Sequence, residues 1–266
     1  MALPPALSIA GSDCSAGAGL QADLKTFSAL GVHGLTAVTC VVAETPRVVT
    51  EVSAVPPVIL QKQIQLLLAT YPIGALKTGM LYSKQHIAAV SELLQGTRIP
   101  VVVDPVMVAS SGDPLLEESA LDAISERLLP LAHIITPNLP EASVILGRPI
   151  LTPDDQEVAA FEIAEKFDCS CYLKGGHFED TPEHRDLFAH SGKLYPFSAP
   201  HLPLPYTHGT GCTLAAALTA GLCQGLDDVA AAEQAHKFTH TALKTSLRWD
   251  TPSGEEVWHL NQLPQS

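Results

Sequence analysis

The most distinctive chemistry-bearing segment is His-Gly-Thr-Gly-Cys at residues 208–212, which lies between a proline-containing loop and a helical pattern. The N-terminus of a helix leaves its first amides without partners inside the helix and carries about half a positive charge, so glycines there let a phosphate approach the backbone. The candidate anion site comprises Gly209, Thr210, Gly211 and Cys212. The alternative is that the glycines only form a tight turn and that Cys212 is a small core residue.

Polar residues also follow three of the predicted strands. Asp104 ends one apolar run. Lys174 and Gly175 end another, where they could contact the phosphates of a nucleotide. Asn138 and Glu141 lie three residues apart at a helix start, where an amide and a carboxylate could hold the water shell of a metal ion. Each feature alone has a structural alternative, namely a loop cap, a helix cap or a solvated lysine beside a turn. Four such strand ends in chain order favour a ligand site.

A superficial match to the dinucleotide-binding fingerprint occurs at Gly17-x-Gly19-x-x-Ala22, with Glu44 near the position of the ribose-binding acid. In that fingerprint the glycines follow the strand directly, whereas Gly17 comes six positions after Gly11. We therefore expect no nicotinamide or flavin site. The Gly-x-x-x-x-Gly-Lys-Ser/Thr pattern of phosphate-binding loops is also absent from the sequence.

The elements that must position these residues alternate along the chain. Short apolar runs are typical of buried strands and occur at residues 6–10, 35–43, 73–79, 99–105, 132–138 and 169–176. Apolar residues at spacings of three and four predict helices at 19–30, 57–71, 83–95, 119–131, 139–146 and 155–167. We expect a hairpin over 185–199, turning at Ser191 and Gly192, and then two closing helices at 211–225 and 227–246.

This alternation predicts an α/β fold in which helices cover both faces of a mainly parallel sheet, with ligands near the carboxyl ends of the strands. No break in composition and no linker divides residues 1–266, so we expect a single domain. A chain of 266 residues is long enough to bury a full core.

The composition excludes several classes of partner. A formal net charge of -13 argues against nucleic acid and anionic lipid, because both require a basic surface. We expect a cytoplasmic protein, because the sequence shows neither a leader pattern nor an apolar run of about 20 residues. The six cysteines form no Cys-x-x-Cys pair, so we expect reduced thiols and no zinc site.

Six strings occur in order along the chain: SIAGSDCSAGAGLQADLKTFSALG, KTGML, VVDPVMVASSGDPLL, ITPNLPEA, LKGGH and THGTGCTLAAAL. Together they resemble the bacterial hydroxymethylpyrimidine/phosphomethylpyrimidine kinases of thiamine synthesis, members of the ribokinase superfamily, over about residues 7–245. The resemblance implies a three-layer ribokinase-like fold, commonly as a homodimer. It also implies ATP-dependent phosphorylation of the hydroxymethyl group of a small molecule, and it allows a second phosphorylation of the monophosphate.

The same resemblance implies roles at the anion site. Gly209, Gly211 and Cys212 would face the transferred phosphoryl group, with Thr210 beside the nucleotide. Most ribokinase relatives carry an aspartate base at the position of Cys212. A thiolate at a helix N-terminus could replace that base, because the dipole lowers the pKa of a thiol. Alternatively, Cys212 only shapes the pocket. We expect His208 to be a structural neighbour of the site, and the same holds for His177.

The metal and nucleotide roles follow in the same way. Asn138 and Glu141 match the superfamily's Asn-x-x-Glu motif, which organises Mg²⁺ through water. Asp104 would lie near that ion and the triphosphate, and Lys174 with Gly175 would meet the ATP.

The acceptor pocket is where the sequence departs from the resemblance. Asp23, Glu44, Met80 and Val106 match positions around the pyrimidine, but residue 44 is usually Gln, within Ala-Gln-Asn-Thr. A Gln amide accepts from the 4-amino group and donates to the ring nitrogen, whereas a carboxylate only accepts. Glu44 therefore requires a protonated pyrimidine, a protonated carboxyl or another substrate, unless it points elsewhere. We predict a charge-assisted pair with a protonated pyrimidine.

Other departures leave alternatives open. Pro205 and Tyr206 replace the usual residues before the anion site, and the last 19 residues lack a Gly-His-Gly-rich tail, so the second phosphorylation is in question. The first alternative function is a pyridoxal or pyridoxine kinase, because relatives with the same Gly-Thr-Gly-Cys end phosphorylate that hydroxymethylpyridine. The second is a non-catalytic binding module with the same fold.

Overall fold

The computed structural model describes residues 2–107, 120–176, 183–202, 204, 208–252 and 254–263. Within these residues the centre of the molecule is a nine-stranded sheet with the order β3-β2-β1-β4-β5-β6-β7-β8-β9. Its strands are β1 (Pro5–Asp13), β2 (His33–Thr45), β3 (Val48–Ala54), β4 (Ala75–Thr78), β5 (Val101–Val103), β6 (Ile134–Ile135), β7 (Ser170–Leu173), β8 (Glu183–His190) and β9 (Lys193–Pro200). In this spatial order the six neighbours β2, β1, β4, β5, β6 and β7 pair in parallel. Strand β3 is antiparallel at one edge, and β8 and β9 are antiparallel at the other. The predicted α/β fold with a mainly parallel sheet is confirmed.

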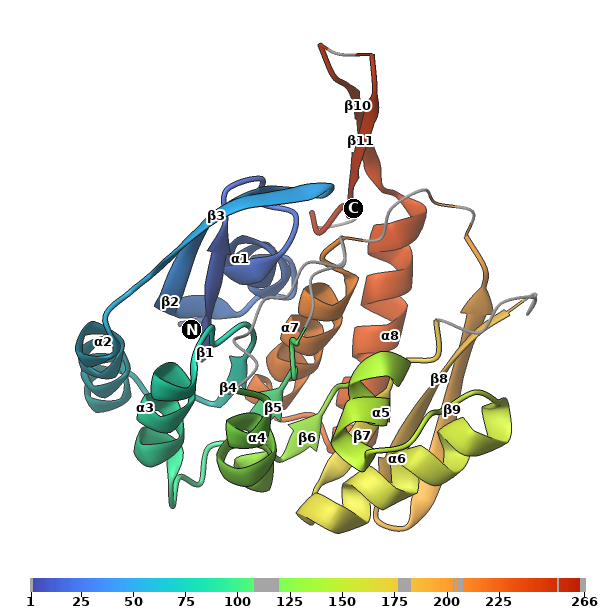
Figure 1. Cartoon of the computed structure of the whole chain (residues 1–266), viewed down its shortest axis with the longest axis horizontal. Coiled ribbons are helices and arrows are strands. Elements are labelled where there is room, and N and C mark those ends of the chain that lie inside the picture. The colour runs from blue at the N-terminus through green and yellow to red at the C-terminus, as the bar shows by residue number, and fades with distance from the viewer. Residues whose placement is uncertain are drawn as a thin grey trace.

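Helices cover both faces of this sheet (Figure 1). They are α1 (Gly19–Ala29), α2 (Pro57–Thr70), α3 (Lys84–Leu94), α4 (Ala120–Ala123), α5 (Leu139–Leu146), α6 (Pro153–Phe167), α7 (Thr210–Cys223) and α8 (Asp228–Lys244). Residues of α2 to α6 belong to the core on one face, while α1, α7 and α8 pack on the other.

The short strand β5 shows why the central strands are apolar throughout. Val101 and Val103 are buried with the helices of one face, and Val102 between them is buried with α7 and α8 on the other face. A strand buried on both faces requires apolar residues at every position rather than at alternate positions.

Three features differ from the sequence predictions. The helix expected over 119–131 is divided into α4, a π-helical turn over Ile124–Leu128 and a 3₁₀ turn over Leu129–Leu131. Pro130 lies in that last turn, where its missing N–H and its ring prevent a regular helix. The edge strand β3 and a terminal ribbon of β10 (Leu247–Asp250) and β11 (Glu256–His259) were not predicted; the ribbon projects from the body in Figure 1.

Candidate active site

The carboxyl ends of the parallel strands meet the N-terminus of α7 and the last turns of α8 around a cavity of about 620 Å³. This cavity brings together most of the residues predicted to form the site. Those that line it are Glu44, Met80, Asp104, Val106, Asn138, Glu141, Lys174, Gly209, Thr210, Gly211 and Cys212. Asp23 and Gly175 do not line it and are treated separately below.

The N-terminus of α7 is built around two glycines, of which Gly209 cannot be replaced by another residue without strain. Gly209 has a φ of 85°, and a Cβ there would lie 1.9 Å from the carbonyl oxygen of Gly17. A Cβ on Gly211 would lie 3.2 Å from Nζ of Lys174 and 3.6 Å from a carboxylate oxygen of Asp104. The glycines therefore let the helix end approach both the β1–α1 loop and the charged cluster, as an anion site requires.

Two opposing effects act on the Cys212 thiol. Burial raises the pKa of Cys212 to about 12, although the ammonium of Lys77 acts in the opposite direction. The role of Cys212 as a base therefore stays a prediction, and burial opposes the lowering of its pKa that the helix N-terminus suggests.

Asp104, Glu141 and Lys174 form a charged cluster across β5, α5 and the end of β7. Nζ of Lys174 lies 3.3 Å from Oδ1 of Asp104 and 3.9 Å from Oε2 of Glu141, and Oδ1 of Asp104 also accepts from the Thr136 hydroxyl. Burial raises the pKa of Glu141 to about 7; Lys174 opposes this rise and Asp104 adds to it.

Asn138 and Glu141 make the helix cap that the sequence left as an alternative. The Asn138 side chain accepts from the Glu141 amide at 2.8 Å, and the Glu141 carboxylate accepts from the Asn138 amide at 2.8 Å. This reciprocal capping box fixes both side chains at the cavity wall. Capping does not exclude a ligand role, because each of these carbonyl and carboxylate groups has further lone pairs.

The donor set of this cluster fits Mg²⁺. Two carboxyl groups and one amide oxygen, supplied by Asp104, Glu141 and Asn138, are the hard oxygen donors that this ion prefers. Within this cluster the described residues pair one ammonium, that of Lys174, with the two carboxyl groups of Asp104 and Glu141, so the fully ionised cluster carries an excess negative charge that a divalent cation would balance.

Gly175 is placed differently from its predicted role. Its amide donates to Oδ1 of Asp186 at 2.9 Å, and a Cβ on Gly175 would lie 1.8 Å from the Arg185 carbonyl oxygen. Gly175 is thus required for close packing against β8, and its amide is already engaged. The neighbouring Gly176 lines the cavity instead.

Asp23 also departs from its predicted contact with the acceptor. Its side chain has no exposed surface, and its carboxylate accepts hydrogen bonds from Lys77, at 2.7 Å, and from the Ser8 hydroxyl. The residue lies behind the cavity wall because the inner face of α1 packs on the sheet at this point. Lys77, which was not assigned a role from the sequence, lines the cavity in its place.

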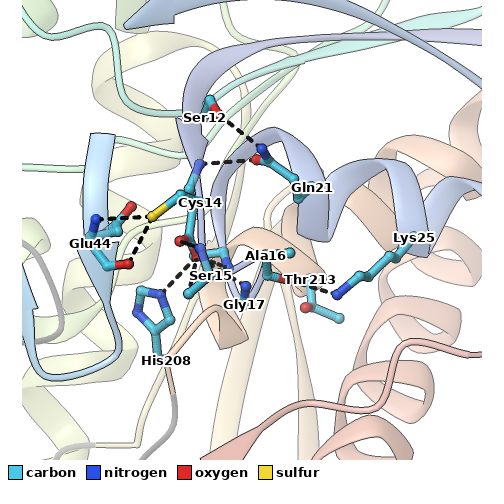
Figure 2. Close-up of polar contacts among 12 residues, drawn as sticks. Ser12, Cys14, Ser15, Ala16, Gly17, Gln21, Lys25, Glu44, His208 and Thr213 are labelled. Atoms are coloured by element: carbon cyan, nitrogen blue, oxygen red, sulfur yellow. Dashed lines mark hydrogen bonds and ion pairs between the residues drawn. The ribbon is translucent and has the colours of Figure 1, made fainter. Parts of the chain in front are cut away.

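Glu44 lines the cavity beside Asp13 and His208, with which its carboxyl group makes a cluster of three potential ligand atoms within 4.8 Å. Among the described residues, no hydrogen-bond donor reaches its carboxylate. Burial and then the charge of Asp13 raise the pKa of Glu44 to about 7, with His208 acting in the opposite direction. Figure 2 shows how the Cys14 thiol holds the Glu44 backbone, at 3.1 Å from its carbonyl oxygen and 3.3 Å from its amide nitrogen.

His208 shares a hydrogen bond with the Asp13 carboxylate at 3.1 Å. The same carboxylate accepts from the amides of Ser15, Gly17 and Ala18, so it organises the β1–α1 loop. Burial opposes ionisation of Asp13, but the bonds from His208 and Ala18 hold its pKa well below the usual range. This arrangement agrees with the structural role predicted for His208.

Several sequence predictions lie outside the described residues. They are His177, Pro205, Tyr206 and the Ser-Gly-Asp-Pro-Leu-Leu string at 111–116.

Two groups of residues that line the cavity were missed from the sequence. Lys77 lies within the apolar run at 73–79 and near the end of β4, so its position close to a strand end was available as a clue. His184, Asp186 and His236 also line the cavity, and both imidazoles contact the buried carboxylate, at 3.3 and 3.5 Å. These three are far apart in the sequence and no spacing connects them.

The sequence profile of the family described as phosphomethylpyrimidine kinase matches residues 13–256. The hydroxymethylpyrimidine/phosphomethylpyrimidine kinase of Rhizobium meliloti is 41% identical over 256 residues, which is 96% of each chain. The solved phosphomethylpyrimidine kinase of Clostridium difficile is 35% identical, with a TM-score of 0.80 over 90% of this chain and 99% of that one. The pyridoxal kinase from Staphylococcus aureus in complex with AMP-PCP and pyridoxal is 34% identical, with a TM-score of 0.87 over 98% and 94%. No described helix is long and apolar enough to cross a bilayer.

Proposed function

The chain belongs to the phosphomethylpyrimidine kinase family, and from this premise we propose that it uses ATP to phosphorylate the hydroxymethyl group of 4-amino-5-hydroxymethyl-2-methylpyrimidine in thiamine biosynthesis. The chain is a kinase with the ribokinase-like fold of its structural neighbours. The monophosphate formed in the first reaction is the acceptor of the second.

One observation carries this proposal: a single cavity joins an anion site, an acidic cluster with a lysine, and a separate apolar end with one carboxyl group. The first two suit the phosphates of a nucleotide and its metal ion. The third, lined by Met80, Val106 and Glu44, suits a small heterocycle with polar edges. A kinase needs these parts side by side, because phosphoryl transfer depends mainly on positioning and on charge stabilisation.

The residues at the centre of the cavity divide the work of binding and stabilisation. Lys174 would contact the phosphates, and the backbone of residues 209–212 would stabilise charge on the phosphoryl oxygens as they move. Asp104, Asn138 and Glu141 would hold Mg²⁺, mostly through water. The ion supplies charge neutralisation between the phosphates when it is bound.

Glu44 would recognise the amino-pyrimidine edge through one shared proton. With its pKa at about 7, the carboxyl group can donate to the ring nitrogen while its other oxygen accepts from the 4-amino group. The protonated-pyrimidine pair predicted from the sequence has the same hydrogen bonds with the proton on the ring. In either form, the complex carries one proton more than a complex of ionised Glu44 with a neutral pyrimidine.

Pyridoxal is the second candidate acceptor. The Staphylococcus aureus enzyme superimposes on this chain more closely than does the Clostridium difficile enzyme, with TM-scores of 0.87 and 0.80. The sequence identity of 41% to the Rhizobium meliloti kinase favours the pyrimidine. Pyridoxal has no amidine edge, so Glu44 would lose one of its two hydrogen bonds to that acceptor.

The proposal is tested by measuring kcat/KM with Mg-ATP for the hydroxymethylpyrimidine, its monophosphate and pyridoxal in the same buffer. We expect the pyrimidine to exceed pyridoxal by at least about tenfold, as the loss of about one good hydrogen bond implies. A pyridoxal preference would replace the proposed acceptor while leaving the kinase assignment intact.

A homodimer remains a proposal that rests on the family resemblance. Light scattering on the purified protein should give about twice the chain mass of 28.1 kDa. A mass of one chain at micromolar concentration would contradict it.

A further inference from the structure

The terminal ribbon of β10 and β11 projects from the body (Figure 1), and the chain then returns to the first turn of α7. We call residues 259–262, which make this return, the tail. They belong to the last 19 residues, where the sequence departs from the resemblance. None of the described residues of this segment lines the cavity, so any part that the tail has in the reaction acts through other residues.

The tail ends in a buried hydrogen bond to α7. Nε2 of Gln262 donates to Oγ1 of Thr213 at 3.1 Å, and both side chains are almost fully buried. The amide of Thr213 in turn donates to the carbonyl oxygen of Gly209 at 2.9 Å. Gln262 is thus tied to the turn that carries the anion site of residues 209–212.

The residues before Gln262 fix its position. Leu260 is buried, and the amide of Asn261 donates to the carbonyl oxygen of Ala242 in α8 at 3.1 Å. Two consecutive residues of the tail are therefore bonded to α8 and α7. Gln262 is a docked side chain rather than one on a loose chain end.

His259, at the start of the tail, packs against the β1–α1 loop. A Cβ on Gly17 would clash with the rings of both His259 and His208, so both imidazoles lie against this glycine. The carbonyl oxygen of Gly17 is in turn the group that a Cβ on Gly209 would strike. The tail thus contacts the loop and the helix that meet at Gly209.

The ribbon is also anchored on the other side of the site. Arg47, in the turn between β2 and β3, lies 2.9 Å from the Glu255 carboxylate and donates to the Glu256 carbonyl oxygen at 3.0 Å. An isolated two-stranded ribbon is marginally stable at best, so it depends on such contacts. The ribbon therefore connects the strand pair that carries Glu44 to the helix that carries the anion site.

Phosphoryl transfer depends on the position of the anion site. Amides at the N-terminus of α7 stabilise charge on the transferred phosphoryl group only if they point at it, and a displacement of about 1 Å can lower the rate about 100-fold. Gly209, which caps α7, has no side chain with which to fix this turn. The contact from Gln262 to Thr213 supplies a fixed point from outside the helix.

We propose that Gln262 is a positioning residue, whose hydrogen bond to Thr213 holds the first turn of α7 so that the amides of residues 209–212 face the transferred phosphoryl group. The proposal rests on the kinase function and on the role of the anion site proposed above. It gives the tail of this chain a part in the reaction although the tail does not reach the cavity.

The test compares Thr213→Val, Gln262→Met and the double variant. Thr213→Val leaves the buried amide of Gln262 without this acceptor, whereas the hydroxyl that remains in Gln262→Met can donate to a carbonyl of its own helix. We therefore expect the urea midpoint to fall more in Thr213→Val than in Gln262→Met. Most of the loss should be recovered in the double variant, because both partners are then apolar.

Catalysis should follow a different order from stability. All three variants lack the hydrogen bond, so kcat should fall by about 10- to 100-fold in each of them, the double variant included. A kcat that follows stability and returns to the wild-type value in the double variant would overturn the proposal, because the contact would then be structural only.

Nucleotide binding gives a second readout, which a merely structural contact would not divide. ADP lacks the γ-phosphate that meets the anion site, so its affinity should stay within about twofold of wild type in every variant. The non-hydrolysable ATP analogue AMP-PCP should bind at least about fivefold more weakly. Unchanged affinity for AMP-PCP, or an equal loss for both nucleotides, would contradict the proposal.

Thr219→Val is the matched control, because Thr219 is also a fully buried threonine of α7 but its hydroxyl donates to the Ala215 carbonyl within the helix. Its kcat should stay within about twofold of wild type. The acceptor in all assays is whichever of the pyrimidine and pyridoxal the wild type phosphorylates faster. Wild type that phosphorylates neither would refute the proposed function itself, whereas failure of the Gln262 proposal shows only in the comparison of variants.

Discussion

The carboxyl group of Glu44 should make acceptor binding depend on pH, and Glu44→Gln should remove that dependence. Burial and the neighbouring Asp13 carboxylate raise the pKa of Glu44 to about 7, while His208 opposes the shift. Other titratable groups near this end are the thiols of Cys14 and Cys40 and the imidazoles of His208 and His259. The contribution of Glu44 is therefore isolated by comparing wild type with Glu44→Gln at each pH.

The magnitude follows from the proton count. If the acceptor binds only to the protonated carboxyl, the apparent KM is multiplied by one plus the ratio of ionised to protonated Glu44. With a pKa of about 7, that factor is about 1.1 at pH 6 and about 11 at pH 8. The acceptor KM should thus rise about tenfold between these two values, and a protonated pyrimidine would give the same direction.

The assay measures the acceptor KM of wild type and Glu44→Gln from pH 6 to pH 8.5 at saturating Mg-ATP. Glu141 also titrates near pH 7, so the comparison between the two proteins at each pH isolates the contribution of Glu44. The Gln variant has a fixed donor and a fixed acceptor, so its KM should change less than about twofold. Parallel pH profiles for the two proteins would refute the reasoning, because Glu44 would then not contact the acceptor.

Three further perturbations follow from the structure. Gly209→Ala places a Cβ 1.9 Å from the Gly17 carbonyl oxygen at a φ of 85°, so urea unfolding should show a loss of at least about 2 kcal/mol, with activity lost as well. Glu141→Gln keeps the capping contacts but removes a charge; titration at fixed ATP should show an affinity for Mg²⁺ at least about tenfold weaker. His133 is hydrogen-bonded to Asp228, which raises its pKa, so the stability that this pair contributes is full below about pH 6.5 and is lost as the pH rises through the folded pKa. Urea unfolding of His133→Gln should therefore differ from wild type most at pH 6 and least at pH 9, by no more than about 1 kcal/mol at this partly exposed site.

Much of the fold could be predicted because apolar runs and helical periodicity report directly on burial. The hairpin turn shows how local chemistry decides local structure: Ser191 and Gly192 have φ values of 49° and 71°, which suit a tight turn at the pair where the sequence predicts one. The edge strand β3 escaped prediction because its side chains are exposed or half-buried, so no apolar run marks it.

The candidate site could be predicted where polar residues follow apolar strands. Asp104, Asn138, Glu141 and Lys174 were found in this way, and the fold brings them together because parallel strands end at the same edge of the sheet. Their roles as ligands and contacts remain predictions.

The differences between sequence and structure concern burial rather than position. The pKa of Cys212 depends on how much water surrounds the thiol, and helix position alone does not reveal this. Asp23 and Lys77 lie 54 residues apart, and only the packing of α1 on β4 shows that the acid holds the lysine instead of the substrate.

The central claim is that this cavity transfers a phosphoryl group from ATP to a hydroxymethyl group. It is tested most directly by phosphorus NMR of the products formed by the wild-type protein from Mg-ATP and 4-amino-5-hydroxymethyl-2-methylpyrimidine. The account predicts a phosphate monoester whose phosphorus couples to the two methylene protons, formed in step with ADP. ADP with inorganic phosphate alone, or no turnover while pyridoxal is phosphorylated, would contradict the proposed acceptor.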